Sequence, residues 1–218
     1  MTQRIALITG ASRGLGAALA EQLAMRGWQV VAVARTVGGL EELDDRVKAS
    51  ALPGAGSLTL APMDVTNDNA MQHLCLNIHQ RWGGVNLWAH AAIHAAPLAP
   101  AGSLDVKDWD KSIATNVRAT GVLIPMVDPL LRARQGAAMF FDDPRGGSKF
   151  FGAYGATKAA QIALAGSWSA ESIKVGPRVM IATPPPMPTA TRARFFPGED
   201  RSTLTHPRDV AASLLDKL

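Results

Sequence analysis

The sequence predicts an α/β fold with a doubly wound parallel sheet, and two observations support this. First, apolar strand-like segments alternate with helix-like segments along all 218 residues, which implies right-handed βαβ crossovers. Second, the strand-like segments are continuous apolar runs, as is typical of parallel strands that are covered on both faces. No internal repeat or linker divides the chain, so residues 1–218 are expected to form a single domain.

The predicted elements follow one another in a regular order. Strands are expected at residues 5–9, 29–34, 58–64, 86–91, 137–141 and 179–183. Helices are expected at residues 15–26, 39–49, 67–82, 106–134, 154–173 and 208–215. The proline-rich segment 183–200 follows the last strand, and ligands bind at the carboxyl ends of strands in open α/β sheets. This segment is therefore a candidate substrate loop.

The composition narrows the classes of protein to which the chain can belong. Hydrophobic residues make up 47% and charged residues 18%, an ordinary globular balance. The net charge of +4 comes without a long basic run, and no apolar stretch has membrane-spanning length. The first strand begins almost at once and leaves no room for a signal peptide, and the single cysteine, Cys75, is expected to be a buried thiol. These features predict a cytoplasmic protein without nucleic-acid or membrane partners.

A glycine-rich turn joins the first predicted strand to the first predicted helix. It reads Thr9-Gly10-Ala11-Ser12-Arg13-Gly14-Leu15-Gly16. Glycine permits a tight turn and a close approach of phosphate oxygens to the backbone, and the helix N-terminus offers unpaired N–H groups and partial positive charge. The pattern predicts a dinucleotide site, with Gly10, Ser12, Arg13, Gly14, Leu15 and Gly16 as its binding residues.

The residues after the second and third strands bear on the choice of cofactor. Dinucleotide sites selective for NAD often carry an acidic residue after the second strand, but here the strand ends in Ala34-Arg35-Thr36. Arg35 and Arg13 can hold a 2′-phosphate, which favours NADP(H) over NAD(H). Asp64, followed by Val65, is expected either to accept a hydrogen bond from the adenine or to cap the helix that begins near Asn67.

A tyrosine and a lysine lie four positions apart in Tyr154-Gly155-Ala156-Thr157-Lys158, on one face of a predicted helix. A phenol has a pKa near 10 and is a poor base at neutral pH, but a nearby ammonium lowers that pKa. The pair can then donate a proton to a carbonyl oxygen or remove one from an alcohol.

With these motifs in order, the chain resembles the short-chain dehydrogenase/reductase family. The resemblance rests on the glycine turn, on Asp64-Val65, on Asn116 in Thr115-Asn116-Val117 and on Tyr154-x-x-x-Lys158. It implies a Rossmann-like domain, a nicotinamide cofactor and hydride transfer to or from a small carbonyl or alcohol substrate. It also implies that Tyr154 is the acid/base, that Lys158 lowers its pKa and holds the nicotinamide ribose, and that Asn116 holds a water in the proton relay.

The chain departs from the pattern of this family at several places. The usual Asn-Asn-Ala-Gly is replaced by Ala89-His90-Ala91-Ala92. The resemblance implies that Thr189, after the last strand, contacts the cofactor. The family's seventh strand is missing, so about six strands and a homodimer are expected, and a tetramer is doubtful. His90 and His94 have no partners at metal spacing, so no metal site is predicted, and His94 is a candidate wall of the substrate pocket.

The sharpest departure concerns the catalytic serine of the family. Asp142 or Asp143 stands where that serine is expected, about a dozen residues before Tyr154, and Ser148 is too close to Tyr154 to replace it. We consider three interpretations for Asp142: a protonated donor, a ligand for a cationic or hydroxyl-rich substrate group, or a brace tied to Arg145 in a site that has lost the serine's role.

Two functions follow from these patterns. The first is an NADP(H)-dependent oxidoreductase with Tyr154 as acid/base and Lys158, Asn116 and Asp142 beside it. The second is a catalytically impaired nucleotide-binding sensor or interaction protein on the same fold. Dehydration or epimerisation on this fold is a further alternative.

Overall fold

A six-stranded parallel sheet forms the centre of the protein, as the sequence predicts. The computed structural model describes residues 3–50 and 53–218. The strands lie in the order β3-β2-β1-β4-β5-β6 and pair in parallel throughout. Their bounds are β1 (Ile5–Thr9), β2 (Gln29–Ala34), β3 (Leu58–Pro62), β4 (Leu87–His90), β5 (Ala137–Phe141) and β6 (Arg178–Ala182).

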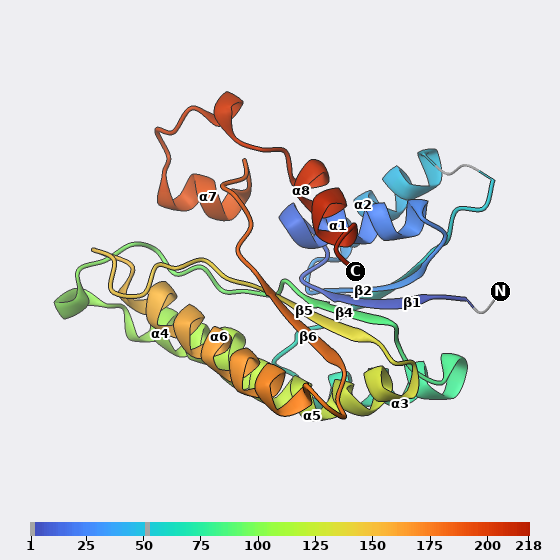
Figure 1. Cartoon of the computed structure of the whole chain (residues 1–218). Coiled ribbons are helices and arrows are strands. Elements are labelled where there is room, and N and C mark those ends of the chain that lie inside the picture. Colours follow the sequence, from blue (N-terminus) through green and yellow to red (C-terminus); the bar gives the residue numbers. More distant parts are fainter. Residues whose placement is uncertain (1–2, 51–52) are drawn as a thin grey trace.

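Helices cover both faces of this sheet (Figure 1). One layer contains α1 (Gly14–Met25), α2 (Val37–Ala49) and α8 (Pro207–Leu215), and the other contains α3 (Asp68–Trp82), α4 (Val106–Ser112), α5 (Ala119–Ala133) and α6 (Gly152–Ser172). Short elements complete the described chain: η1 (Ala101–Ser103), η2 (Ile113–Arg118), α7 (Ala190–Phe195) and η3 (Arg201–Thr203).

Each face of the sheet has its own hydrophobic core, because successive side chains of a strand point to opposite faces. On β1, Ala6 and Ile8 join the core beneath α1, α2 and α8, while Ile5 and Leu7 join the core beneath α3, α5 and α6. The continuous apolar runs are therefore explained by burial on both sides.

The third strand is shorter than the sequence predicts. It ends at Pro62, and Asp64 lies beyond it in a turn where its Oδ1 accepts hydrogen bonds from the backbone N–H and the hydroxyl of Thr66. The cap of α3 is Asn67, whose Oδ1 accepts from the N–H of Ala70. The alternative role of Asp64 as a helix cap is therefore wrong, because the nearer Asn67 satisfies that N–H.

The single helix predicted for residues 106–134 contains a π-helical segment. Helix α4 runs into η2, which runs into α5, and Asn116 lies within η2. The Asn116 carbonyl accepts hydrogen bonds from Thr120 Oγ1 and Gln161 Nε2. Side chains therefore bind this carbonyl where the regular backbone hydrogen bonds of the α-helix are interrupted. Such π-helical turns are frequent at functional sites.

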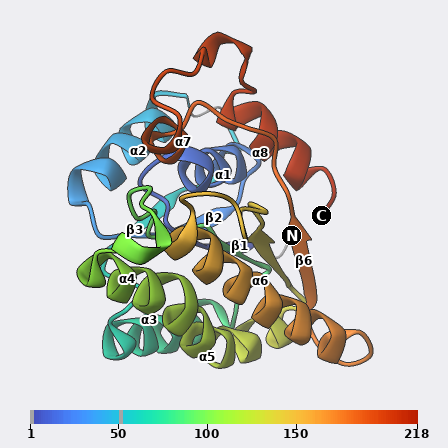
Figure 2. The same cartoon turned by 90° about the vertical axis from the view of Figure 1, so that its left-hand side faces the viewer.

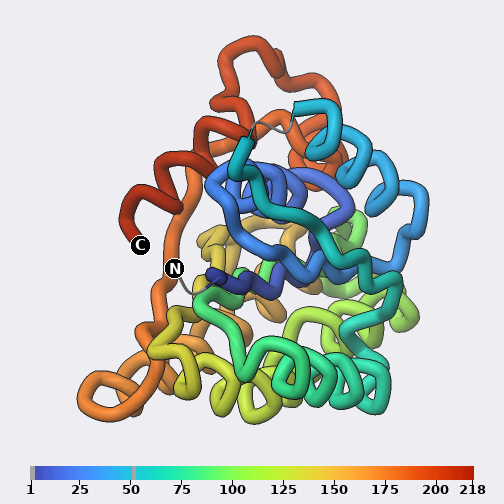
Figure 3. Tube along the Cα trace, turned by 90° about the vertical axis from the view of Figure 1, so that its right-hand side faces the viewer, coloured from blue at the N-terminus to red at the C-terminus, as the bar shows by residue number. Residues whose placement is uncertain are grey.

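The segment 183–200 also holds more structure than a loop. It contains α7, capped by Thr189, and it crosses the carboxyl ends of the strands, as Figure 2 shows. The chain then returns in α8, which packs beside α1 (Figure 3), and Arg178 on β6 donates to the carbonyl of Lys217. None of the described helices is long and apolar enough to cross a membrane.

Candidate active site

A cavity of about 480 Å³ opens at the carboxyl ends of the strands. The glycine turn after β1, the ends of β2, β4 and β5, the first turns of α6 and the segment that contains α7 line it. The cavity therefore lies where an open α/β sheet binds its ligands.

The glycine turn can exist only with glycine at two of its positions. A Cβ on Gly10 would lie 2.6 Å from the carbonyl carbon of Ala91, and a Cβ on Gly16 would lie 2.3 Å from the Gly10 carbonyl oxygen. Gly10 also has a φ of +81°, which a side chain would disfavour. Helix α1 begins at Gly14 in this turn, so its first N–H groups and its positive end lie at the cavity.

The three charged residues that we expect at the adenosine end of the cofactor lie at this cavity. Arg13, Arg35 and Asp64 all line it, and Arg35 Nη1 lies 3.7 Å from Asp64 Oδ2. The Arg35 side chain is 61% exposed, so this ion pair leaves it accessible to a ligand. Ser12, Leu15 and Val65 also line the cavity.

Thr189 lies next to the glycine turn at the cavity. Its Oγ1 accepts from the N–H of Arg192, and a Cβ built on Gly14 would lie 3.4 Å from its methyl group. The residue is thus close to the helix α1 terminus. Together, the glycine turn, the free helix terminus and the arginines fit the shape and charge of a dinucleotide phosphate group.

Tyr154 also lines the cavity, and its hydroxyl contacts Asp143, not Asp142. Its hydroxyl donates to Asp143 Oδ2 at 3.1 Å, and Arg145 Nε donates to Asp143 Oδ1 at 3.0 Å. The brace to Arg145 that we considered for Asp142 is therefore formed by Asp143. Asp142 also lines the cavity, and its backbone N–H donates to the Ala182 carbonyl.

The pKa of Tyr154 is shifted in the direction opposite to the prediction. Burial of the phenol raises this pKa above its ordinary value, and the charge of Asp143 and its hydrogen bond raise it further, while Arg145 lowers it. Burial lowers the pKa of Lys158 to about 8, partly offset by Asp142 and Asp143. The Tyr154 hydroxyl therefore keeps its proton at neutral pH.

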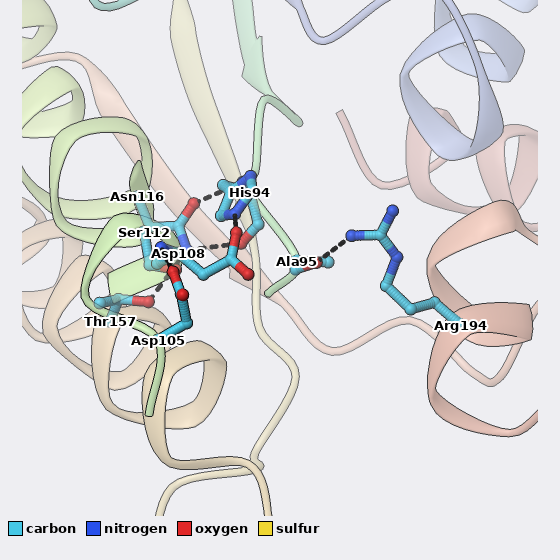
Figure 4. Close-up of polar contacts among 8 residues, drawn as sticks. All are labelled: His94, Ala95, Asp105, Asp108, Ser112, Asn116, Thr157 and Arg194. Atoms are coloured by element: carbon cyan, nitrogen blue, oxygen red, sulfur yellow. Dashed lines mark hydrogen bonds and ion pairs between the residues drawn. The ribbon is translucent and has the colours of Figure 1, made fainter. Parts of the chain in front are cut away.

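Asn116 binds the loop after β4 instead of pointing into the cavity. Its Oδ1 accepts from the His94 N–H at 2.7 Å, and its Nδ2 donates to the His94 carbonyl and to Thr157 Oγ1. Figure 4 shows this arrangement, with the His94 ring beside Asp108 on α4. The side chain of Asn116 thus fixes the loop, and its backbone carbonyl accepts from Thr120 on α5 and Gln161 on α6.

His94 is not among the residues that line the cavity, whereas His90 is. The expectation that His94 forms a pocket wall is therefore wrong: its Nε2 lies 3.4 Å from Asp108 Oδ1, on the α4 side. The neighbouring loop is also fixed from α7, because Arg194 Nη1 donates to the Ala95 carbonyl at 2.6 Å (Figure 4).

His90 is a buried neutral histidine. Thr120 Oγ1 already donates its proton to the Asn116 carbonyl, so it accepts from His90 Nε2, and Thr9 Oγ1 donates to His90 Nδ1. Burial and the charge of Lys158 lower the pKa of His90 to about 3. The ring therefore occupies the centre of the sheet without a charge.

Because folded His90 stays neutral, we expect the free energy of unfolding to fall in acid. Between pH 6.5 and about 3 the unfolded chain binds a proton that folded His90 does not, so the free energy of unfolding falls as pH falls through this window. The slope from this group approaches about 1.4 kcal/mol per pH unit. The free energy of unfolding, measured with denaturant at a series of pH values, should depend less steeply on pH in His90→Asn than in wild type. The exposed control His73→Asn should show the wild-type dependence. Equal slopes in wild type and both variants would contradict the prediction.

An aromatic wall beside Tyr154 was missed by the sequence analysis. The Phe195 ring on α7 lies 4.8 Å from the Tyr154 ring and 5.0 Å from the Phe151 ring, between ring centres. These three residues form a small buried cluster of their own. The position of Phe195 in the candidate substrate loop was its only signal.

Cys75 is buried on α3, and burial raises the pKa of its thiol to about 11, which makes it unreactive at neutral pH. The residues that the structure describes contain no cluster of three or more metal-ligating side chains.

Comparison with known proteins agrees with this geometry. An uncharacterized oxidoreductase of Staphylococcus aureus is 27% identical over 218 residues, which cover 99% of this chain and 90% of the relative. A solved structure from Pseudomonas syringae, described as a short chain dehydrogenase, superposes with a TM-score of 0.89 at 28% identity, covering 98% of this chain and 88% of the other. A Shigella flexneri structure in complex with NADP superposes with a TM-score of 0.85 at 25% identity, covering 96% and 88%.

The family profile for short chain dehydrogenases matches residues 4–200, which run from the first strand through the glycine turn, Tyr154 and Lys158 to the end of the segment around α7. With its sheet order, its glycine turn and its tyrosine and lysine at one cavity, the chain belongs to the short chain dehydrogenase family of oxidoreductases.

Proposed function

We propose that the protein is an NADP(H)-dependent oxidoreductase that reduces a small carbonyl compound, with Tyr154 as the proton donor. One observation carries this proposal: the Tyr154 hydroxyl, Lys158 and the glycine turn line the same cavity. The nicotinamide cofactor, when bound, supplies or accepts the hydride.

The residues of this chain favour proton donation over proton abstraction. A phenol whose pKa is raised stays protonated and can transfer its proton to an oxygen that becomes negative, whereas removal of a proton from an alcohol requires the phenolate. Lys158 holds a positive charge nearby, and Phe151 and Phe195 exclude water from one side of the phenol.

The proposed preference for NADP(H) rests on charge. Arg35 follows β2 where a carboxylate would repel a 2′-phosphate, and Arg13 precedes α1 in the same cavity. The solved NADP complex of a structure with the same fold is consistent with this preference.

Calorimetric titration with NADPH and NADH tests the cofactor directly. Wild-type protein is expected to bind NADPH at least about tenfold more tightly than NADH, since the 2′-phosphate gains charge-assisted hydrogen bonds. Arg35→Ser is expected to lower NADPH affinity by about tenfold or more and to leave NADH affinity nearly unchanged. The exposed Arg81→Ser on α3 is the matched control. Equal affinities for the two cofactors in wild-type protein would overturn the preference.

One observation favours the second candidate, a nucleotide-binding protein without efficient catalysis. Asp143 accepts the hydrogen bond of the Tyr154 hydroxyl, and a carboxylate at this place opposes negative charge on a substrate oxygen. Tight NADPH binding without turnover on a panel of small carbonyl compounds would support this candidate.

A further inference from the structure

The side chain of Gln161 is buried beside Lys158, and the dinucleotide site and the proton donor do not account for it. Gln161 lies on α6, three residues after Lys158, and is 1% exposed. Its Oε1 accepts from Lys158 Nζ at 2.7 Å. Its Nε2 donates to the Asn116 carbonyl at 3.1 Å and to Thr120 Oγ1 at 3.0 Å.

The orientation of this amide follows from its neighbours. The opposite orientation would place the NH₂ group against the ammonium and the oxygen against the Asn116 carbonyl. Only one orientation matches donors with acceptors, and in it both protons of Nε2 are used. The amide is therefore fixed from the η2 side, with its oxygen presented to Lys158.

Lys158 is a buried cation that donates a hydrogen bond to Gln161. Its side chain is 5% exposed, and of the residues that the structure describes only Gln161 accepts a hydrogen bond from Nζ. The charges that act on it are those of Asp142 and Asp143, which line the same cavity, and the neighbouring His90 is neutral. Burial disfavours an ammonium, so the loss of its acceptor would favour the uncharged amine.

We propose that Gln161 is a positioning residue that holds the Lys158 ammonium through its amide oxygen and fixes it to the Asn116 carbonyl in the π-helical segment. The consequence for the reaction rests on the proposed function, because it requires that Lys158 serves the proton donor. The contact itself is independent of turnover.

NMR titration of the lysine side chains tests the proposal, with the Lys158 signal assigned by its absence in Lys158→Met. Gln161→Met has a similar length and no strong acceptor, and it is expected to lower the Lys158 midpoint by about one pH unit or more. Gln161→Glu places a carboxylate against the ammonium and is expected to raise the midpoint by about one unit. Gln80→Met and Gln80→Glu, on the exposed face of α3, are the matched controls and should leave the midpoint unchanged.

Shifts in opposite directions would support a direct contact, because general damage to the fold moves both variants the same way. Unchanged midpoints, or shifts of the same sign, would overturn the proposal.

The same variants separate this inference from the proposed function. If the protein reduces carbonyl compounds, the alkaline limb of the pH–rate profile is expected to move with the NMR midpoint in each Gln161 variant. Opposite NMR shifts in a protein that transfers no hydride would uphold the role of Gln161 and overturn the proposed function. Carbonyl reduction by a protein whose Lys158 midpoint is the same in all Gln161 variants would uphold the proposed function and overturn the role of Gln161.

Discussion

Tyr154→Phe is expected to reduce carbonyl turnover by about 10²–10⁴-fold while NADPH binding stays within a few-fold of wild type. The substitution removes the only group in the cavity that we assign as proton donor and keeps the ring that packs against Phe195. Asp143 loses the Tyr154 donor but keeps its ion pair with Arg145, so the loop around it should hold its position. Steady-state kinetics and calorimetry on the same preparation measure the two effects.

The control for this substitution lies on the same helix. Ser167→Ala removes an exposed hydroxyl from α6 and should leave turnover and binding unchanged. Wild-type turnover in Tyr154→Phe would eliminate the proposed mechanism. Loss of NADPH binding together with turnover would assign the tyrosine a role in holding the cofactor instead.

The fold could be predicted from sequence because the signals that define it are local. Continuous apolar runs mark strands that are buried on both faces, and the glycine turn is recognised by its own residues between the first strand and the first helix. The six strands appear in the predicted order along the chain, with the third one shorter.

The predictions for the helix around Asn116 and for the cap of α3 were wrong because they depend on how the chain folds in space. The π-helical turn around Asn116 involves a hydrogen bond from Gln161, which lies 45 residues away, so no local pattern announces it. Asp64 and Asn67 are both good capping residues three positions apart, and only the course of the chain after Pro62 decides between them.

The candidate site was predicted in outline and not in its contacts. Tyr154 and Lys158 follow from helical spacing, and the same spacing would have found Gln161 as a polar residue on the buried face of α6. Which of two adjacent aspartates reaches Tyr154 depends on how the chain turns after β5, and the sequence leaves this open. The direction of the Tyr154 pKa shift depends on that same turn.

Asp143→Ser is expected to raise carbonyl turnover by roughly tenfold to a hundredfold, the reverse of what most substitutions in an active site do. The carboxylate accepts a hydrogen bond from the Tyr154 hydroxyl and adds negative charge where the substrate oxygen becomes negative. A serine hydroxyl at this place can donate a hydrogen bond to that oxygen and removes the charge that raises the pKa of Tyr154.

The ionisation of Tyr154 can be followed directly, because it is the only tyrosine in the sequence. Tyrosinate absorbance in wild-type protein should develop only well above pH 10, and in Asp143→Ser at a lower pH than in wild type, since the hydrogen bond and the nearest negative charge are both gone. Asp142→Ser is the neighbouring control. Asp142 is the weakest of the charges that act on the phenol, so its removal should move the absorbance much less. If Asp143→Ser loses turnover while the tyrosine ionises earlier, Asp143 itself contacts the substrate, as a protonated donor or as a ligand for a cationic group. If turnover rises with that ionisation shift, the aspartate is what restrains an otherwise complete oxidoreductase site, and the binding-protein alternative is excluded.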